Sequence, residues 1–358
     1  MAAGQIAFTT PATATPWQRW MVFSPMGRIV FFAALYFVMF KLVSAGVSAT
    51  GIMAPGVTPL SRAFGIMLMQ LIPAVVAYII LVKAIERRRL QELAARDIPT
   101  LGVAGLVAGA LLFSLVVLVL WLAGSYHVTG TNPDVNWLPA VLTTGLGAGI
   151  GEEIITRGVL FRAVEEGLGT WWALAISALF FGAAHVFNPG ATLWSSLAIA
   201  IEAGILLALL YHVTRSLWPC IGLHAAWNVM QGTVYGIPVS GTAAHGWLVS
   251  NCTGPDWLSG GADADTFIFS SADASQMVSG KPQDVIADFQ QGYDKIDLHA
   301  LDLGINDLIE IDNQSIDGAN YAFVGVDANH NGQLDEGEFA VAVKMAAGTT
   351  LHNSDFIF

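Results

Sequence analysis

The chain has 358 residues, of which 54% are hydrophobic and 12% are charged, against about 25% charged residues in an ordinary soluble domain. Residues 1–260 carry 12 Lys and Arg and 10 Asp and Glu, whereas residues 261–358 carry 3 and 17. This division excludes a wholly soluble globular protein, and the acidic second part argues against nucleic acid as a partner.

Apolar runs in the first 236 residues predict about seven membrane-spanning helices. Most approach the roughly 20 residues that cross the hydrocarbon core, although polar residues, Pro and Gly interrupt or bound the fourth, fifth and seventh. The expected spans are residues 29–48, 63–84, 101–123, 136–160, 170–187, 193–213 and 217–236. The first run starts late and no small-residue cleavage site follows it, which favours a retained helix over a removed signal peptide.

The basic loops predict an orientation in the lipid bilayer. Arg87–Arg89 follow the second span and Arg19 and Arg28 precede the first, whereas residues 124–136, after the third span, contain no Lys or Arg. Cytoplasmic loops carry the excess of basic residues, so the N-terminus is expected in the cytoplasm. Seven spans would then place the C-terminal domain outside, in a multi-pass protein of the bacterial inner membrane.

Alternating segments separated by Gly, Asn and Asp predict a small β domain after the membrane part. The expected strands lie within residues 265–270, 295–301, 321–326, 339–345 and 355–358. The predicted fold class is therefore a polytopic all-α membrane bundle at residues 1–257, followed by a soluble, acidic all-β domain at residues 258–358.

The stretch "GIGEEIITRGVLF", residues 149–161, places two glutamates and an arginine inside an apolar run. Ionised groups such as Asp or Arg at a bilayer centre cost roughly 2.5–3.5 kcal/mol each on insertion scales, so compensation or use is expected. On a helix Glu153 and Arg157 are four residues apart and can pair. Glu152 is rotated about 100° away and is left free.

Two further pairs lie one helical turn apart on later spans, Phe181 with His185 and His224 with Asn228. A free Glu can take a proton from water while a His holds that water. A second His and an Asn can donate hydrogen bonds to the resulting oxyanion. Alternatively, Glu152 and the two histidines could hold a zinc ion with an open position. The spacing leaves both chemistries open.

The ordered motifs EExxxR, FxxxH and HxxxN resemble those of the CAAX protease and bacteriocin-processing family, over about residues 60–258. These proteins are polytopic intramembrane endopeptidases related to CAAX prenyl protease 2. The resemblance implies that Glu152 and His185 activate water, that His224 and Asn228 stabilise the oxyanion, and that Glu153 and Arg157 support them. It also implies a membrane-associated, CAAX-protein-like substrate, and it leaves the metal dependence of catalysis open.

Two other functions compete with the protease. One is a non-catalytic membrane scaffold or bacteriocin-immunity-type protein that keeps the polar cluster for folding and carries a calcium-stabilised external domain. The other is a transporter that uses Glu152 and Glu202 as a proton relay, which is disfavoured because no internal repeat is evident. Glu202, in the sixth span, is otherwise expected to support the site or to make a structural hydrogen bond.

The acidic tail contains a predicted calcium loop, "DANHNGQLDEGE", whose flanks alternate like strands. Its side-chain oxygens follow the spacing of calcium loops, with a glycine at the sharp turn; the alternative is a polar β-turn. The expected ligands are Asp327, Asn329, Asn331, Gln333 through its carbonyl, Asp335 and Glu338, with Gly332 at the turn.

A second calcium-related signal precedes this loop. The run "GGADADTFIF" resembles one calcium-binding β-roll repeat, through Gly260, Gly261, Asp263, Asp265 and Phe267. Residues 258–358 as a whole resemble the C-terminal, RTX-like domain of serralysin-type secreted proteins. Calcium is thus an expected cofactor of this domain.

Overall fold

The structure is a computed structural model, and it forms two compact units. One unit contains Met1–Val119 and Val128–Ser250, and the other contains Leu120–His127 and Asn251–Phe358. The expected domain boundary after residue 257 thus lies close to the division after Ser250. The structure describes residues 10, 13–188, 191–240, 246–251, 257–260, 263–269, 276–278, 280–282, 284–301, 307–316, 319–327, 329–345 and 349–358.

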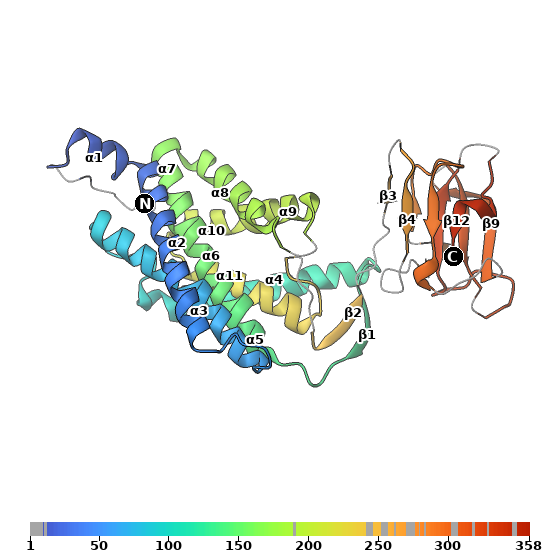
Figure 1. The fold of residues 1–358 in the computed structure, drawn as a ribbon, viewed down its shortest axis with the longest axis horizontal. Coiled ribbons are helices and arrows are strands. Elements are labelled where there is room, and N and C mark those ends of the chain that lie inside the picture. Colours follow the sequence, from blue (N-terminus) through green and yellow to red (C-terminus); the bar gives the residue numbers. More distant parts are fainter. Residues whose placement is uncertain are drawn as a thin grey trace. The chain divides into compact units, whose positions relative to one another are not determined.

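The first unit is helical, and each predicted span falls on a helical stretch (Figure 1). Several stretches contain π-helical turns, labelled η. In chain order they are α1 (Pro16–Met21), α2 (Pro25–Ala49), α3 (Pro59–Ile80) with η1 (Leu81–Ile85), η2 (Ala95–Asp97, a 3-10 turn) with η3 (Ile98–Gly102) and α4 (Val103–Leu122), α5 (Trp137–Ala140) with η4 (Val141–Ala148), α6 (Gly149–Glu153), η5 (Ile154–Phe161) and α7 (Arg162–Leu168), α8 (Thr170–His185), α9 (Leu193–Ile199) with η6 (Ala200–Gly204) and α10 (Ile205–Thr214), and α11 (Trp218–Val229) with η7 (Met230–Val234).

Within the described residues, four helical stretches are long and apolar enough to cross a membrane. They are Pro25–Ala49, Pro59–Ile85, Ala95–Leu122 and Leu193–Thr214. The helix α8 is apolar but has only 16 residues, and the stretch from α5 to α7 is interrupted by its charged residues. The expected count of seven spans is therefore not confirmed, although a mostly helical membrane part is.

Local sequence explains where the long helices begin. The Ser24 side chain accepts a hydrogen bond from the Gly27 N–H at 3.0 Å, and Pro25 occupies the first helical position of α2. Thr58 and Pro59 repeat this arrangement at the start of α3. A capping hydroxyl satisfies one free N–H of the first turn, and proline has no N–H to leave unsatisfied there.

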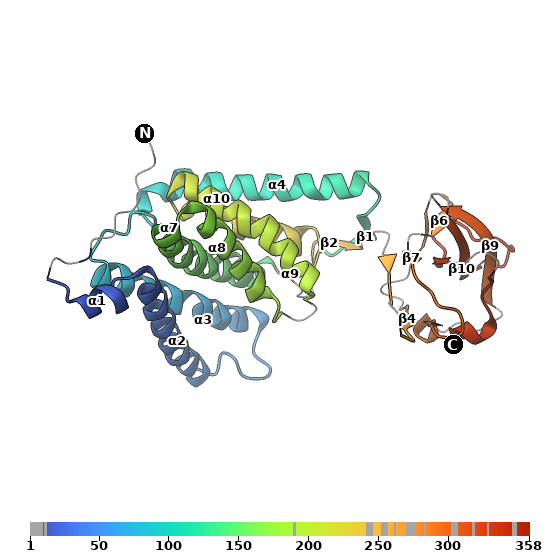
Figure 2. The ribbon, with the colours of Figure 1, turned by 90° about the horizontal axis from the view of Figure 1, so that it is seen from above.

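Small residues set the close helix contacts that position α8 and α11. A Cβ atom on Gly109 of α4 would lie 2.4 Å from the Leu223 carbonyl oxygen, and one on Gly182 of α8 would lie 2.3 Å from that of Ser196. Glycine therefore lets these backbones touch, as is typical of membrane helices. In Figure 2, α4 lies on one side of the helical unit and α2 and α3 on the other, with α8 and α10 between them.

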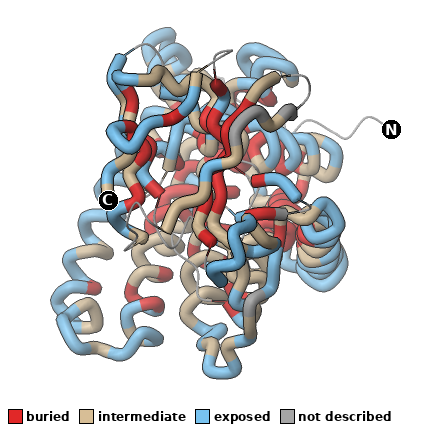
Figure 3. Tube along the Cα trace, turned by 90° about the vertical axis from the view of Figure 1, so that its right-hand side faces the viewer, coloured by how far each residue is buried: buried red, intermediate tan, exposed pale blue. Residues whose placement is uncertain are grey.

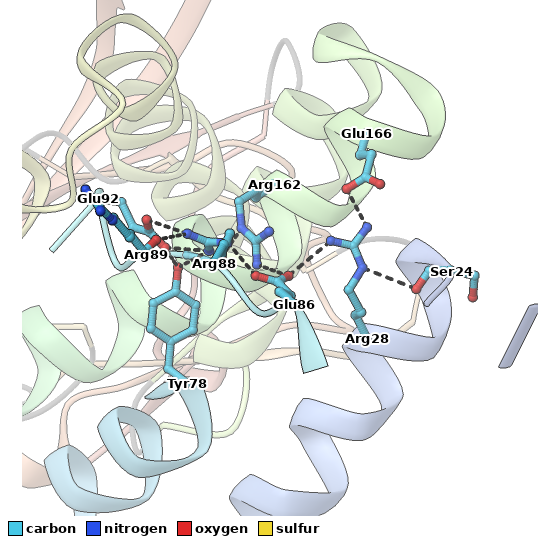
Figure 4. A network of polar contacts seen from close by, with 10 residues as sticks. Ser24, Arg28, Tyr78, Glu86, Arg88, Arg89, Glu92, Arg162 and Glu166 are labelled. Carbon is cyan, nitrogen blue, oxygen red and sulfur yellow. Dashed lines mark hydrogen bonds and ion pairs between the residues drawn. The ribbon is translucent and has the colours of Figure 1, made fainter. Parts of the chain in front are cut away.

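Charged residues form a buried network next to the helical core (Figure 4). Glu86, directly after η1, is contacted by Arg28 of α2 at 3.1 Å, by Arg88 at 2.6 Å and by Arg162 of α7. Arg88 also donates to both carboxylate oxygens of Glu92, at 2.6 and 2.8 Å. The basic patch Arg87–Arg89 is therefore more than a solvated loop, because its Arg88 side chain is buried as an ion-pair partner. We call this cluster the Glu86 network.

The second unit contains a small β domain, as predicted. The strand β3 (Trp257–Leu258) pairs in parallel with β7 (Asp284–Ile286), which pairs in parallel with β11 (Ala340–Lys344). In a second sheet, β8 (Lys295–Asp297) pairs in parallel with both β4 (Thr266–Ile268) and β12 (Phe356–Ile357). Successive strands thus alternate between two sheets, in the order β3, β4, β7, β8, β11, β12, like the turns of a coil. The segments expected to be strands contain β4, β8, β10, β11 and β12.

Antiparallel strands extend the first sheet of this domain. The strand β10 (Ala319–Val326) pairs with β11 on one side and with β9 (Leu308–Ile316) on the other. Buried side chains, among them Ile286, Ile296, Val324 and Val341, fill the space between the sheets. The β domain also contains the pair β5 (Met277–Val278) and β6 (Lys281–Pro282). A separate pair, β1 (His127–Thr131) with β2 (Leu248–Asn251), lies mostly in the first unit. Figure 3 shows the buried segments in red and the exposed outer faces of the peripheral helices in pale blue.

Candidate active site

The helix that carries the two glutamates lies against α3 and α11. A Cβ on Gly149 would lie 3.3 Å from the Ala225 Cβ, and one on Gly151 would lie 3.1 Å from the Gln70 carbonyl oxygen. The glycines that precede Glu152 therefore allow three backbones to approach closely. As a result Glu152 and Glu153, at the end of α6, reach side chains from α8 and α11.

Glu153 is fully buried and holds two partners. Its Oε1 atom lies 2.9 Å from Arg157 and 2.9 Å from the Nδ1 atom of His224. The expected ion pair with Arg157 is thus present, whereas the contact with His224 was not expected from the sequence. Glu153 therefore links the stretch from α5 to α7 to α11.

Arg157 links the site to the stretch formed by α9, η6 and α10. Its Nη2 atom donates to the carbonyl oxygens of Ala203, at 3.2 Å, and Gly204, at 2.8 Å, in the π-helical turn η6. Its guanidinium carbon lies 4.6 Å from the centre of the Phe181 ring, a favourable position for a cation over an aromatic face. Phe181 also packs edge-on against His224, so the phenylalanine of the FxxxH motif holds both the arginine and the second histidine in place.

Glu153 is paired through Oε1 only, and its Oε2 atom, like the Oε2 atom of Glu152, has no hydrogen-bond partner among the described residues. Glu152 differs in its place between two imidazole nitrogens. Its side chain is 36% exposed, and its Oε2 atom lies 3.9 Å from the Nε2 atom of His185 and 3.9 Å from that of His224. Among the described residues, Oε2 has no hydrogen-bond partner. Both distances are too long for direct hydrogen bonds, and a single water molecule can bridge polar atoms at such a separation.

The hydrogen bonds of the two histidines define which ring nitrogens face Glu152. His185 Nδ1 lies 2.7 Å from the Phe181 carbonyl oxygen, and His224 Nδ1 lies 2.9 Å from the Glu153 carboxylate. Both acceptors lack protons, so each Nδ1 donates. In a neutral ring the other nitrogen is then an acceptor, and both Nε2 atoms face the Glu152 oxygen.

Asn228 makes its hydrogen bond outside this cluster. Its amide nitrogen donates to the Thr144 carbonyl oxygen at 3.1 Å, and it makes no hydrogen bond to Glu152, His185 or His224. It lies one turn after His224 on α11. Glu202 is exposed and, within the described residues, makes no hydrogen bond or ion pair. The expected structural hydrogen bond of Glu202 is therefore not found.

No group of three or more His, Cys, Asp or Glu residues is arranged to hold a metal ion in the described part of the chain. Neither Glu152, His185 and His224, the alternative zinc ligands, nor the loop carboxylates Asp327, Asp335 and Glu338 form such a group. The donor types of the first set suit zinc, and the reaction proposed below involves only residues of this chain.

The predicted calcium loop connects β10 and β11. The Asp327 carboxylate accepts the backbone N–H groups of Asn331, at 3.0 Å, and Gly332, at 2.6 Å. Burial opposes ionisation of Asp327, but the backbone hydrogen bonds from Gly332 and Asn331 together outweigh it and hold its pKa below the usual value. The Asn329 and Asn331 amides both donate to Asp335 Oδ2. Asn329, Asn331 and Asp335 therefore meet through their side chains, whereas Asp327 binds the backbone of the loop.

The same loop orients its remaining predicted ligands. The Glu338 carboxylate accepts the backbone N–H of Asp335 at 2.8 Å, and Gln333 donates its own N–H to Asn331 Oδ1. Both flanks are strands, as predicted, so the loop is not a helix–loop–helix site.

In the predicted β-roll repeat, the Gly260 and Asp265 N–H groups donate to Asp288 and Asp294 of the next turn, each at 3.0 Å. Phe267 is buried between the sheets and Asp263 is exposed. Gly261 lies outside the described residues. The repeat therefore contacts its neighbouring turn through backbone donors and aspartate acceptors.

Comparison with known proteins gives one family. Residues 134–230 match the family model described as "Type II CAAX prenyl endopeptidase Rce1-like". The matched region contains every residue of the predicted catalytic and supporting set, and it lies inside the range over which the sequence motifs resemble CAAX proteases. No match was found among curated proteins. The match supports a protease relationship for this part of the chain, and the four apolar helices indicate an integral membrane protein.

Proposed function

We propose that the protein is an intramembrane endopeptidase that cleaves a membrane-associated, CAAX-protein-like substrate. The observation that carries this proposal is the Glu152 carboxylate oxygen, which lies 3.9 Å from an imidazole nitrogen on each of two other helices. The family match supports the same reaction class. A hydrolase needs a base, a positioned water and donors for an oxyanion, and this cluster offers the groups for each role.

In the proposed reaction, Glu152 takes one proton from a water molecule. His185 Nε2 accepts the other water hydrogen and so orients the nucleophile. The water oxygen attacks the carbonyl carbon of the scissile peptide bond, and the carbonyl oxygen becomes an oxyanion. Glu152 then passes its proton to the amide nitrogen as the C–N bond breaks, which yields a new amine and a new carboxylic acid; the acid then loses its proton to solvent.

His224 acts as the oxyanion donor in this scheme. Its Nδ1–H is already committed to Glu153, so its Nε2 can donate only when the ring carries two protons. The buried Glu153 carboxylate stabilises that imidazolium, and Arg157 forms an ion pair with the same carboxylate. Asn228 supplies the second donor through the amide hydrogen that Thr144 does not use. We propose the orientation expected from the basic loops, with the N-terminus in the cytoplasm.

We also propose that loop 327–338 binds calcium and stabilises an external, RTX-like domain. The parallel coil of short strands supports this, because β-roll repeats build such coils. Asp327, Asp335 and Glu338 supply carboxylates at the expected positions. Asn329 and Asn331 now present amide nitrogens to Asp335, and a half-turn of each amide would present oxygen instead.

Terminal proteomics of membranes tests the protease proposal. New protein N-termini are identified in cells that carry the wild-type protein, the Glu152→Gln variant or neither, and the variant is first shown to reach the membrane at equal abundance. Termini present only with the wild type identify substrates. An identical set of termini in all three samples would refute the proposal.

A further inference from the structure

Two charged residues stand apart from the others in the candidate membrane spans. Lys41 lies within α2 and Glu202 lies within the stretch Leu193–Thr214. All other Asp, Glu, Lys and Arg residues of the four candidate spans lie within three residues of a helix end. Charged side chains in the middle of a span are costly in lipid and usually have a partner. One of these two is a cation and the other an anion.

Neither residue finds an ionic partner within the described part of its own chain. The Lys41 ammonium lies 5.4 Å from the centre of the Phe37 ring on the same helix, and Glu202 makes no hydrogen bond or ion pair. Both side chains are exposed. A cation–π contact with Phe37 satisfies only part of the lysine charge.

The ion pairs of Arg28 and Arg215 indicate that Lys41 and Glu202 lie at the same depth in the membrane. Arg28 of α2 contacts Glu166, and Arg215, directly after α10, contacts Glu165. The two glutamates are adjacent on α7, so Arg28 and Arg215 lie at the same end of the helical unit. Lys41 follows Arg28 by 13 residues and Glu202 precedes Arg215 by 13 residues. At 1.5 Å per residue, each is about 20 Å from that end.

Both residues lie on apolar, uncovered helix faces. Only 6% of the apolar window of α2 is buried within the chain, and Phe37, Val38 and Leu42 around Lys41 are all exposed. Ile201 and Ile205 beside Glu202 are exposed as well. The small residues Ala200 and Gly204 face α8 instead, so Glu202 points away from the packed side of its helix.

We propose that α2 of one molecule binds the helix Leu193–Thr214 of a second copy of this chain, through a Lys41–Glu202 ion pair in the membrane. The charges are complementary, their depths match, and both are surrounded by uncovered apolar side chains. The two faces are different surfaces, so the contact is head-to-tail and builds a ring or a row rather than a two-fold dimer. Glu202 precedes Ala203, whose carbonyl accepts from Arg157, so the association face and the site share one helical segment.

Association of the full-length protein is measured in phosphatidylcholine vesicles, by energy transfer between donor- and acceptor-labelled molecules at increasing lipid dilution. Neutral lipid removes anionic headgroups as partners for Lys41. The wild type is expected to associate. Lys41→Met and Glu202→Gln should each weaken association by about three- to thirtyfold, the range that single interhelical polar contacts give in membranes. Lys83→Met, which removes an exposed cation at a helix end, is the matched control and should change nothing.

Charge exchange then identifies the partners. The Lys41→Glu protein carries two anions at the interface and the Glu202→Lys protein carries two cations, so each should fail to self-associate. The two proteins should associate when mixed, because opposite charges then meet across the interface. Each variant is first shown to melt as the wild type does; where an exchanged variant does not fold, the two neutral variants decide. A wild type that stays monomeric, equal association of the neutral variants and the wild type, or folded exchange variants that do not associate on mixing would each overturn the proposal.

Discussion

Two buried polar clusters in the helical unit use similar residues in opposite ways. In the Glu86 network, each carboxylate oxygen of Glu86 and Glu92 contacts a guanidinium group. At the candidate active site, the Glu152 Oε2 atom has no hydrogen-bond partner among the described residues and lies between two imidazoles. The Glu86 and Glu92 carboxylates, whose oxygens are all paired, stabilise the fold, whereas the unpaired Glu152 oxygen between two imidazoles can accept a proton.

The pKa directions in the Glu86 network fit this difference. Burial alone opposes ionisation of Glu86, but Arg162 and Arg88 outweigh it and hold the pKa of Glu86 below its usual value. Burial also opposes ionisation of Glu92, and hydrogen bonds from Arg88 again hold its pKa low. Both groups therefore remain charged near neutral pH and serve as fixed anions rather than as proton acceptors.

The largest expected effect on stability comes from breaking the Glu86 network. Glu86→Gln leaves Arg28, Arg88 and Arg162 without a shared anion, and removing one partner of a buried pair typically costs about 3–5 kcal/mol. Chemical unfolding of the full chain in mixed micelles measures the change. Glu166→Gln, which removes a half-exposed partner of Arg28, is the control and should cost less than about 1 kcal/mol. Equal losses of unfolding free energy in the two variants would show that Glu86 contributes no more to stability than an exposed ion-pair partner does.

Calcium should stabilise the β domain by a smaller amount. An ion that binds only the folded state at 100 times its dissociation constant contributes about 2.7 kcal/mol. Hydrogen exchange of β10 and β11 in the full-length protein, with calcium and with chelator, reports this change. The increase in protection should disappear in the Glu338→Gln variant. Protection that does not respond to calcium would identify loop 327–338 as a polar turn.

The contact between Glu153 and His224 should contribute to catalysis by a free energy comparable to, or smaller than, the calcium effect on stability. Glu153→Gln keeps the shape but removes the charge that stabilises the His224 imidazolium. A hydrogen bond to a charged group contributes about 1.5–3 kcal/mol, so the cleavage rate should fall about 10- to 100-fold. The pH profile distinguishes this role from a purely structural one, because the variant should lose activity at a lower pH than the wild type. An unchanged pH profile would contradict the proposed role of His224.

The smallest expected effect is the acid sensitivity of the Glu86 network. The pKa values of Glu86 and Glu92 are lower in the folded state than in the unfolded state. Their contribution to stability is thus complete above the unfolded pKa of glutamate, about 4.3, and is lost as the pH falls through the folded values. Between about pH 6 and pH 3, the melting midpoint of the wild type should fall more steeply with decreasing pH than that of Glu86→Gln. An equal pH dependence of the melting midpoint in the two proteins would place the acid-sensitive groups elsewhere.

Much of the site could be predicted from sequence because its key pairs lie one helical turn apart. The contact of Glu153 with Arg157 follows from helical geometry alone. The contact of Glu153 with His224 and the bonds of Arg157 to Ala203 and Gly204 could not be predicted in this way. They join residues 46 to 71 positions apart. Two of them use backbone carbonyls in a π-helical turn, and the side-chain sequence does not predict such a turn.

The same distinction holds for the rest of the fold. Each predicted apolar run falls on a helical stretch, but the runs could not show that the Arg88 side chain and Glu92 are buried, because both contact Tyr78 of α3. Alternation located β10 and β11, whereas β9 carries Glu310, Asp312 and Gln314 among its apolar residues and was not predicted. Short parallel strands such as β3 and β7 have too few residues to show a period.

The most direct test compares Glu152→Gln with the wild type, in liposomes, on a peptide substrate identified by the terminal proteomics. Both the cleavage rate and the melting midpoint are measured on the same preparations. Because Glu152 is the proposed general base and its Oε2 atom makes no direct hydrogen bond to the described residues, the rate should fall by about 10²- to 10⁴-fold while the melting midpoint stays unchanged. A variant that cleaves at the wild-type rate, or one that loses activity only in proportion to lost folded protein, would contradict the account.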